Sequence, residues 1–157
     1  MEEKHVSDAL HCLNKYFDKY TCHPIFDENE FRYVFLNNAF VSSYVVLENE
    51  TVIDMISFYK LPSKVLKDSK NKNYPYINAG YLYYYSSNVE TVFTLVSGIL
   101  VAAKNEGMHV FNVLDIMENK LIFDDLKFQE GTGRLYYYMY NYKCIQMNES
   151  QIAKILL

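Results

Sequence analysis

The spacing of apolar and polar positions predicts three helices. Residues 4–19 place apolar side chains three and four positions apart, so that one face of a helix would be apolar. Asp27 and Glu30 form a capping-box pattern, which predicts a short second helix that ends near residue 36. Residues 89–106 are apolar nearly all round, and we expect this third helix to begin after a capping Asn88 and to be buried on more than one side.

β-Branched and aromatic runs predict the strands. Gly107 should end the third helix in the left-handed conformation, and the run 109–114 behind it has the composition of a buried strand. Further strands are predicted over residues 40–47, 51–59, 76–85 and 134–143, with a hairpin turn between the first two and an exposed loop at 63–75. The element order predicts an α/β fold with a mixed sheet, in a single domain over residues 1–157.

Composition excludes several classes of protein. The chain has 157 residues, half of them hydrophobic, and a net charge of −4, which gives no general electrostatic reason to bind nucleic acid. No apolar run approaches the ~20 residues that a membrane span needs. The start of the chain is acidic and polar, unlike a secretory signal or transit peptide. An odd number of cysteines without CxxC spacing favours reduced thiols, and we expect a cytoplasmic protein.

The sequence gives no support for a zinc site or for a nucleotide-hydrolysing site. His11, Cys12, Cys22 and His23 match no zinc spacing, and we expect no metal site. No glycine-rich phosphate loop is present, which excludes a nucleotide hydrolase.

Polar residues in and after the run 109–114 need an explanation. Asn112 lies inside the predicted strand and Asp115 at its end, where α/β proteins often bind ligands. From the pattern alone, both residues either hold the fold or serve a ligand. We expect Asp115 to cap a following helix, and Glu118 to be structural.

Tyrosines recur at every second position of two predicted strands. They are Tyr81, Tyr83 and Tyr85 in one strand and Tyr136, Tyr138, Tyr140 and Tyr142 in the other. Packing of rings between sheet and helix explains them best. Base stacking on single-stranded nucleic acid is disfavoured by the acidic balance. The wall of a groove for an extended peptide is the remaining alternative.

The chain ends in an apolar tip, whereas most termini are polar and frayed. One interpretation is that the α-carboxylate of Leu157 is buried together with the tip. The other is that only Ile152, Ile155 and Leu156 pack, while the carboxylate stays in water.

Four strings of the sequence, in register along nearly the whole chain, resemble one family. They are IDMISFYKLPS at 53–63, AGYLYYY at 79–85, GMHVFNVLDIMEN at 107–119 and GTGRLYYYMYNYKC at 131–144. Together they resemble the C-terminal half of eukaryotic glycylpeptide N-myristoyltransferase. The resemblance implies a Gcn5-related N-acyltransferase-like fold, a mixed sheet flanked by helices, as one of two pseudo-symmetric halves. It implies transfer of myristoyl from myristoyl-CoA, a co-substrate with no further cofactor, to the N-terminal glycine of protein substrates.

The resemblance also implies roles for individual residues. By matching position, the terminal carboxylate of Leu157 resembles the general base. The positions that resemble peptide-binding residues are Ser63, Tyr81, Asn112, Thr132 and Gly133. Thr132 departs from the family, which usually has Asp between these two glycines, and this change should weaken attraction to cationic groups on the peptide.

Nothing in the sequence resembles the acyl-CoA half of the family, so we expect the N-terminal half of the same enzyme as a partner. The chain would then be a fragment, a separately encoded half or a truncated product. A second hypothesis is a non-catalytic module that binds N-terminal glycine peptides or regulates a partner. A third is a complete small acyltransferase using another CoA ester. Against the third, the apolar helix start at Asn88-Val89 is a poor substitute for a glycine-rich pyrophosphate turn.

Overall fold

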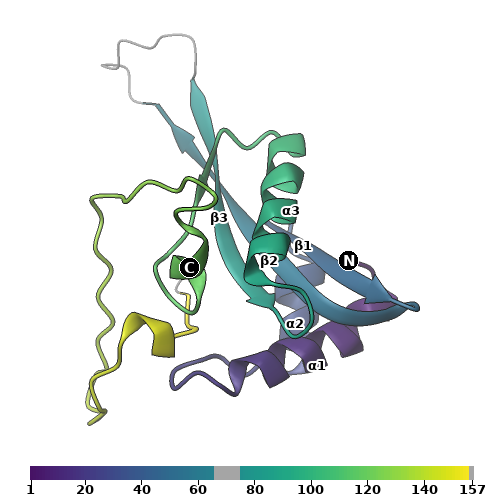
Figure 1. The fold of residues 1–157 in the computed structure, drawn as a ribbon, viewed down its shortest axis with the longest axis horizontal. Coiled ribbons are helices and arrows are strands. Elements are labelled where there is room, and N and C mark those ends of the chain that lie inside the picture. Colours follow the sequence, from purple (N-terminus) through teal and green to yellow (C-terminus); the bar gives the residue numbers. More distant parts are fainter. Residues whose placement is uncertain (66–74, 156–157) are drawn as a thin grey trace.

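The computed structural model describes residues 1–65 and 75–155 and contains a four-stranded mixed sheet flanked by helices (Figure 1). The strands, in the spatial order β1-β2-β3-β4, are β1 (Val41–Glu48), β2 (Thr51–Lys64), β3 (Tyr76–Ser86) and β4 (Val110–Asn112). The first three pair antiparallel, and β4 runs parallel to β3. The predicted α/β class, mixed sheet and hairpin are confirmed. The hairpin turn consists of Asn49 and Glu50. Both residues have positive φ, as the two central residues of a type I′ turn require.

The helices lie on both faces of this sheet (Figure 1). They are α1 (Val6–Phe17), α2 (Glu28–Phe31), a π-helical turn (Arg32–Leu36) and α3 (Val92–Asn105), with short 3-10 turns at Glu3–His5, Asn119–Ile122 and Glu149–Gln151. The α1 helix packs on β2 and β3, while α3 crosses the opposite face. Asp27 and Glu30 form the predicted capping box of α2.

Of the three predictions for α3, the structure confirms its end at Gly107 and contradicts its cap and its burial. Thr91, not Asn88, is the cap, and its hydroxyl accepts the N–H of Thr94 at 3.1 Å. Gly107 has φ +80° and ends the helix as predicted. The expectation of burial on more than one side is wrong, because Phe93 and Val101 are exposed on the face turned away from the sheet.

The structure also corrects the predictions for the second half of the chain. Residues 134–143 form no strand, and most of their side chains are exposed along an outer loop (Figure 1). A strand needs a neighbouring backbone to bond, and no described strand pairs with this segment. Asp115 is exposed and caps nothing, because the next turn begins only at Asn119. The β2 strand runs on to Lys64, into the predicted loop, whose residues 66–74 lie outside the described residues.

Gly107→Ala should destabilise the chain by about 1–2 kcal/mol, because an L side chain is strained at positive φ. The matched control is Gly98→Ala inside α3, where an added Cβ meets nothing within 4 Å. That change should stabilise the chain by about 0.5–1 kcal/mol through helix propensity. Urea unfolding of both variants measures the difference, and equal effects would contradict the left-handed helix end.

Candidate functional site

The pairing of β3 with β4 brings two predicted groove residues together. The parallel ladder has three positions, Ala79 with Val110, Gly80 with Phe111 and Tyr81 with Asn112. Beyond it, β3 continues to Ser86 while β4 ends. The two strands therefore part at Tyr81 and Asn112. A fork at the carboxyl ends of parallel strands is where α/β proteins usually place a ligand.

Gly80 makes this close pairing possible. A Cβ at Gly80 would lie 2.9 Å from Cδ2 of Phe111, so the ring of Phe111 occupies the space of the missing side chain. The same ring packs on Phe58, with the ring centroids 5.7 Å apart. A larger residue at Gly80 would displace Phe111 and, with it, the neighbouring Asn112.

Tyr59 completes an aromatic surface at the fork. It lies opposite Tyr81 on β2, and the two rings stack with centroids 4.9 Å apart and planes 7° from parallel. Tyr83 meets Tyr59 edge-on at 5.6 Å. Burial, with a smaller contribution from Tyr81, raises the pKa of the Tyr59 hydroxyl, and burial raises the pKa of Tyr83 to about 12. These two hydroxyls therefore stay protonated at neutral pH and offer uncharged hydrogen-bonding groups.

Ser63 belongs to the same strip but lies farther along the sheet. It pairs with Ile77, two same-face positions beyond the Tyr59–Tyr81 pair, about 13 Å away by the rise of a strand. It is exposed. Ser63, Tyr81 and Asn112 thus follow one face of neighbouring strands, as a groove for an extended peptide would require. Tyr59 was missed by sequence analysis, although its position in the SFYKLPS string, four residues before Ser63, could have indicated it.

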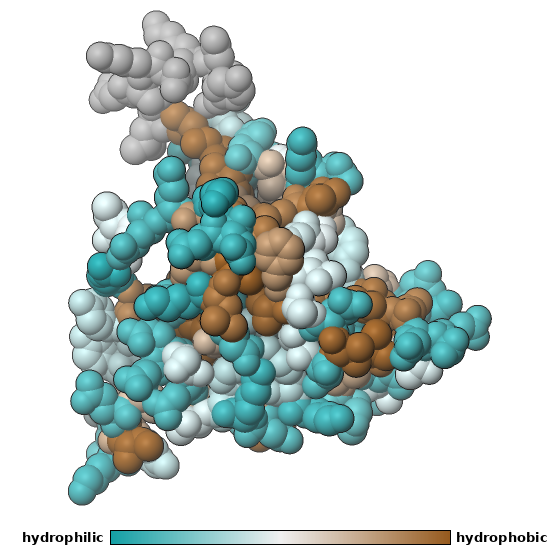
Figure 2. Space-filling model, viewed as in Figure 1, coloured by the Kyte–Doolittle hydropathy of each residue, from teal (hydrophilic) through white to brown (hydrophobic). Residues whose placement is uncertain are grey.

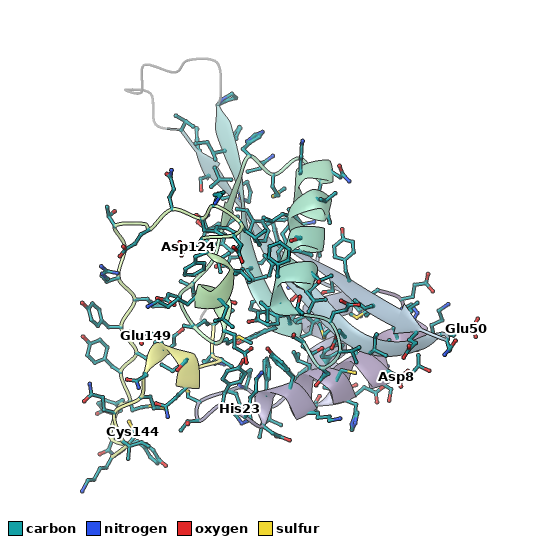
Figure 3. The ribbon with its side chains drawn as sticks, viewed as in Figure 1. Asp8, His23, Glu50, Asp124, Cys144 and Glu149 are labelled. Atoms are coloured by element: carbon teal, nitrogen blue, oxygen red, sulfur yellow. The ribbon has the colours of Figure 1, made fainter. Side chains whose placement is uncertain are left out.

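Thr132 and Gly133 are not brought to this strip by any hydrogen bond between described residues. Both are exposed in the outer loop that leads to Cys144. In Figure 3 several side chains along this loop point away from the rest of the molecule, whereas Tyr137 reaches inward to the carbonyl of Lys154. The structure therefore groups three of the five predicted groove positions and leaves the other two apart.

The C-terminal segment enters the core beside the loop that follows α1. The N–H groups of Thr21 and Cys22 donate to the carbonyl of Gln151 at 3.0 and 3.1 Å, and the N–H of Ala153 donates to the carbonyl of Cys22 at 2.8 Å. Ala153 is fully buried and Ile155 is 5% exposed. The segment is thus held like a short strand up to Ile155. Leu157, the predicted general base, lies outside the described residues, as does Leu156.

Tyr84 holds the last described residue of this segment. Its hydroxyl accepts the N–H of Ile155 at 2.9 Å and donates to the carbonyl of Ile155 at 3.3 Å. The Tyr84 side chain is 1% exposed, and burial raises the pKa of its hydroxyl. One residue earlier, the hydroxyl of Tyr137 donates to the carbonyl of Lys154. Two tyrosines far apart in sequence therefore fix the backbone just before the chain end.

Glu118 anchors the other side of the segment. The preceding Met117 has φ +56°, and its N–H donates to the carbonyl of Ile152 at 3.2 Å. The Glu118 carboxylate accepts hydrogen bonds from Lys19 at 2.6 Å, from Tyr20 at 3.0 Å and from Tyr16. Burial raises the pKa of Glu118, but these donors outweigh burial and hold it below its usual value. Glu118 is structural, as predicted: it ties α1 to the corner where Met117 binds the backbone of Ile152.

A separate apolar hollow of about 310 Å³ lies between α3 and the β1–β2 hairpin. Apolar residues also gather on the surface beside this hairpin (Figure 2). None of the predicted site residues lines the hollow. Within residues 1–65 and 75–155, no group of three metal-ligating side chains gathers. No helix of those residues has the length and apolar character to cross a membrane.

Comparison with known proteins supplies a family context for this geometry. The sequence pattern described as "Myristoyl-CoA:protein N-myristoyltransferase, C-terminal domain" matches residues 1–155. A glycylpeptide N-tetradecanoyltransferase of Plasmodium falciparum is 37% identical over 158 residues, which cover all of this chain and 38% of that protein. A probable glycylpeptide N-tetradecanoyltransferase of Caenorhabditis elegans is 37% identical over 159 residues, with 99% of this chain and 35% of that protein covered.

Solved structures agree in fold. Saccharomyces cerevisiae N-myristoyltransferase with bound myristoyl-CoA superposes with a TM-score of 0.71 at 28% identity, over 85% of this chain and 37% of that chain. A predicted acetyltransferase with acetyl-CoA from Clostridium acetobutylicum superposes with a TM-score of 0.64 at 16% identity, over 88% and 92% of the two chains, which is a likeness of fold alone. The chain spans less than two fifths of the length of the curated relatives described above.

Glu118→Gln should lower the free energy of unfolding by about 1 kcal/mol at pH 7, because Lys19 loses its charged partner. The folded-state pKa of Glu118 lies below the unfolded value. Its stabilisation is therefore complete above the unfolded pKa of ~4.3 and is lost as pH falls through the folded pKa. Urea unfolding at pH 7 and below pH ~4 should show the difference between wild type and variant shrink with acid.

Glu130→Gln is the matched control, because Glu130 and Arg134 form an ion pair whose side chains are 77% and 68% exposed. Removal of an exposed pair should change stability by less than about 0.5 kcal/mol. A Glu118 effect that stays constant with pH would contradict a charge-dependent anchor.

Proposed function

Because this chain belongs to the family of myristoyl-CoA:protein N-myristoyltransferase C-terminal domains, we propose that it forms the peptide-binding half of a glycylpeptide N-tetradecanoyltransferase. The reaction would join the α-amine of an N-terminal glycine to the thioester carbonyl of myristoyl-CoA. The C–N bond forms, the C–S bond breaks, CoA leaves as its thiol or thiolate, and the amine loses a proton to a base. The N-terminal half of the enzyme would supply most of the acyl-CoA pocket and the oxyanion hole.

The observation that carries this proposal is the burial of the C-terminal segment. Termini are usually frayed, but here the backbone of Ile155 is bonded on both its N–H and its carbonyl by Tyr84. Only two residues separate Ile155 from the end of the sequence. A backbone held in this way at Ile155 would position the residues that follow it, and the proposed general base is the terminal carboxylate of Leu157.

A terminal carboxylate in water would be a poor base for this reaction. Its pKa of ~3.5 lies about 4 units below that of an α-amine at ~7.7–8.0, which corresponds to roughly 5–6 kcal/mol against proton transfer. Burial raises the pKa of a carboxylate and strengthens its attraction to an ammonium group. The buried surroundings of Ala153 and Ile155 support such a shift for a carboxylate that follows them.

The strip of Ser63, Tyr81 and Asn112, with Tyr59, is our proposal for the peptide groove. Its residues lie on one face of adjacent strands, so a peptide lying across β2, β3 and β4 would meet tyrosine rings and an amide. Thr132 and Gly133 would join the groove from the outer loop. With Thr132 in place of the family's usual Asp, the groove should attract cationic peptide groups less strongly.

The exposed side chains of the outer loop support the proposal of a protein partner. Large apolar side chains of this loop are exposed, namely Leu135, Tyr136, Tyr138, Met139, Tyr140, Tyr142 and Ile145. Their sequence favours a strand, but no described strand pairs with them. Relatives carry more than half of their length outside the matched region. We therefore assign this surface to the N-terminal half, whose contacts would bury these rings.

A short peptide tag appended after Leu157 should lower turnover by about 10²–10⁴-fold in a complete enzyme that carries this chain as its C-terminal half. The tag removes the free carboxylate and moves the charge away from its place. The measurement is the release of CoA with a glycine-initiated peptide, together with peptide affinity by calorimetry. The control is the same tag at the start of the N-terminal half.

Undiminished turnover of the tagged enzyme would overturn the role of the terminal carboxylate. Peptide binding without any turnover in the untagged enzyme, with myristoyl-CoA present, would instead support a non-catalytic module for N-terminal glycine peptides.

Tyr84→Phe should lower kcat about tenfold while KM changes little, because the hydroxyl that fixes Ile155 is lost. Tyr84 would act as a positioning residue. The pH profile of kcat should also shift, because a less confined carboxylate is better solvated and its pKa falls.

Tyr85→Phe is the matched control. Tyr85 is as buried as Tyr84, and its hydroxyl donates to Asn119 at 2.9 Å, so its loss should cost similar stability. It makes no hydrogen bond to residues 152–155. If both variants lose the same activity and neither shifts the pH profile, Tyr84 has only a structural role.

A further inference from the structure

The turn that joins β3 to α3 surrounds a buried carboxylate. The last pair of β3 with β2 is Ser86 with Met55, and the chain then leaves the sheet for the cap Thr91. On β2 the next residue is Asp54, which pairs with Val46 of β1 but has no partner on the β3 side. Its side chain is fully buried. Asp54 therefore lies beside the turn, whose backbone N–H groups need hydrogen-bond acceptors once the chain has left the sheet.

Three successive backbone N–H groups of the turn converge on Asp54. Oδ1 accepts the N–H of Asn88 at 2.6 Å, and Oδ2 accepts those of Val89 at 3.0 Å and Glu90 at 2.6 Å. Asp54 forms no ion pair with any described residue. The charge is thus met by backbone dipoles alone, close to the start of the 14-residue helix α3.

This arrangement is that of an anion nest. Successive N–H groups that point into one concavity, ahead of a helix start, are the device with which proteins hold phosphate groups. Here the anion in the nest is not a free ligand but a side chain of the same chain. The adjoining α1 closes the corner, because the side chain of Asn88 donates to the carbonyl of Cys12 at 3.3 Å.

We propose that Asp54 is a built-in anion that occupies a phosphate-type nest at the β3–α3 turn, and thereby closes this turn to phosphate-bearing ligands. The carboxylate stabilises the turn in the way that a bound phosphate would. One consequence, which rests on the proposed function, is that this half takes no CoA pyrophosphate at the turn. The acyl-CoA must then be held by the other half. The alternative of a complete small acyltransferase is disfavoured for the same reason.

The test is chemical rescue by formate, which has the carboxylate and the charge of the missing side chain and is small enough for the space that it leaves. Asp54→Gly should lower Tm by roughly 10 °C or more, because three charge-assisted hydrogen bonds are lost. Sodium formate at about 100 mM should restore much of this loss in a saturable way, and sodium chloride at equal ionic strength should not. Inorganic phosphate should also stabilise the glycine variant more than the wild-type chain.

Asp54→Asn is the second variant, in case the glycine chain does not fold. The amide keeps the shape but turns N–H groups toward the N–H groups of the turn, so it should be destabilised and formate should not restore it. Failure of formate to raise the Tm of Asp54→Gly, or wild-type stability of Asp54→Asn, would overturn the proposal. Neither measurement involves catalysis, so the outcome is independent of the proposed transferase activity.

Discussion

The candidate site depends on one extra residue in β3. Between the pairs Phe58–Leu82 and Ile56–Tyr85, β2 advances by two residues and β3 by three. Ser57 closes this bulge, because its hydroxyl donates to the carbonyl of Tyr84 at 2.8 Å and accepts the Tyr84 N–H at 3.2 Å. A regular strand would send Tyr83 and Tyr84 to opposite faces. With the bulge, both rings pack on Phe35, on the side of α1 and α2.

The bulge places the residues of two proposed roles on a single strand. Before it, Tyr81 stacks on Tyr59 and lies beside Asn112, at the fork with β4. After it, the Tyr84 ring packs beside that of Tyr83, and its hydroxyl holds Ile155. Only Leu82 and Tyr83 therefore separate Tyr81 of the proposed peptide strip from Tyr84, which holds Ile155. In the proposed reaction the glycine amine and its base must meet, and a rigid strand keeps their supports at a constant separation.

Local signals allowed the prediction of most of the fold. Asp27 with Glu30, and Gly107, each act within one turn of backbone, and the structure contains both the capping box and the left-handed helix end. The run 134–143 has strand composition as well, but a strand also requires a partner, which local sequence cannot supply. Asn88 is a residue type that often caps helices, but its side chain binds Cys12 and its N–H binds Asp54, 34 residues away, and the helix begins only after Thr91.

The candidate site was less accessible to the same reasoning. The resemblance indicated Tyr81 and Asn112, and the sheet register brings them together. Tyr59, Tyr84 and Glu118 act across 22 or more residues, through stacking or hydrogen bonds that arise only once the sheet has formed. Periodicity describes the face of an element but not which side chain on that face will reach a distant backbone.

The surroundings of Asp54 and Glu118 argue against either side chain as the general base of the proposed reaction. A base must have a free lone pair and must gain from taking a proton. Asp54 already accepts three backbone hydrogen bonds in a buried turn, so both of its oxygens are engaged by the fold. Glu118 is held in its charged form by Lys19 and two tyrosines, which lowers its pKa. Both carboxylates are occupied by neighbouring donors and have a structural role. The proposed base, the terminal carboxylate of Leu157, follows Ile155, which is buried and apolar. Apolar surroundings with few hydrogen-bond donors favour the uptake of a proton by a carboxylate.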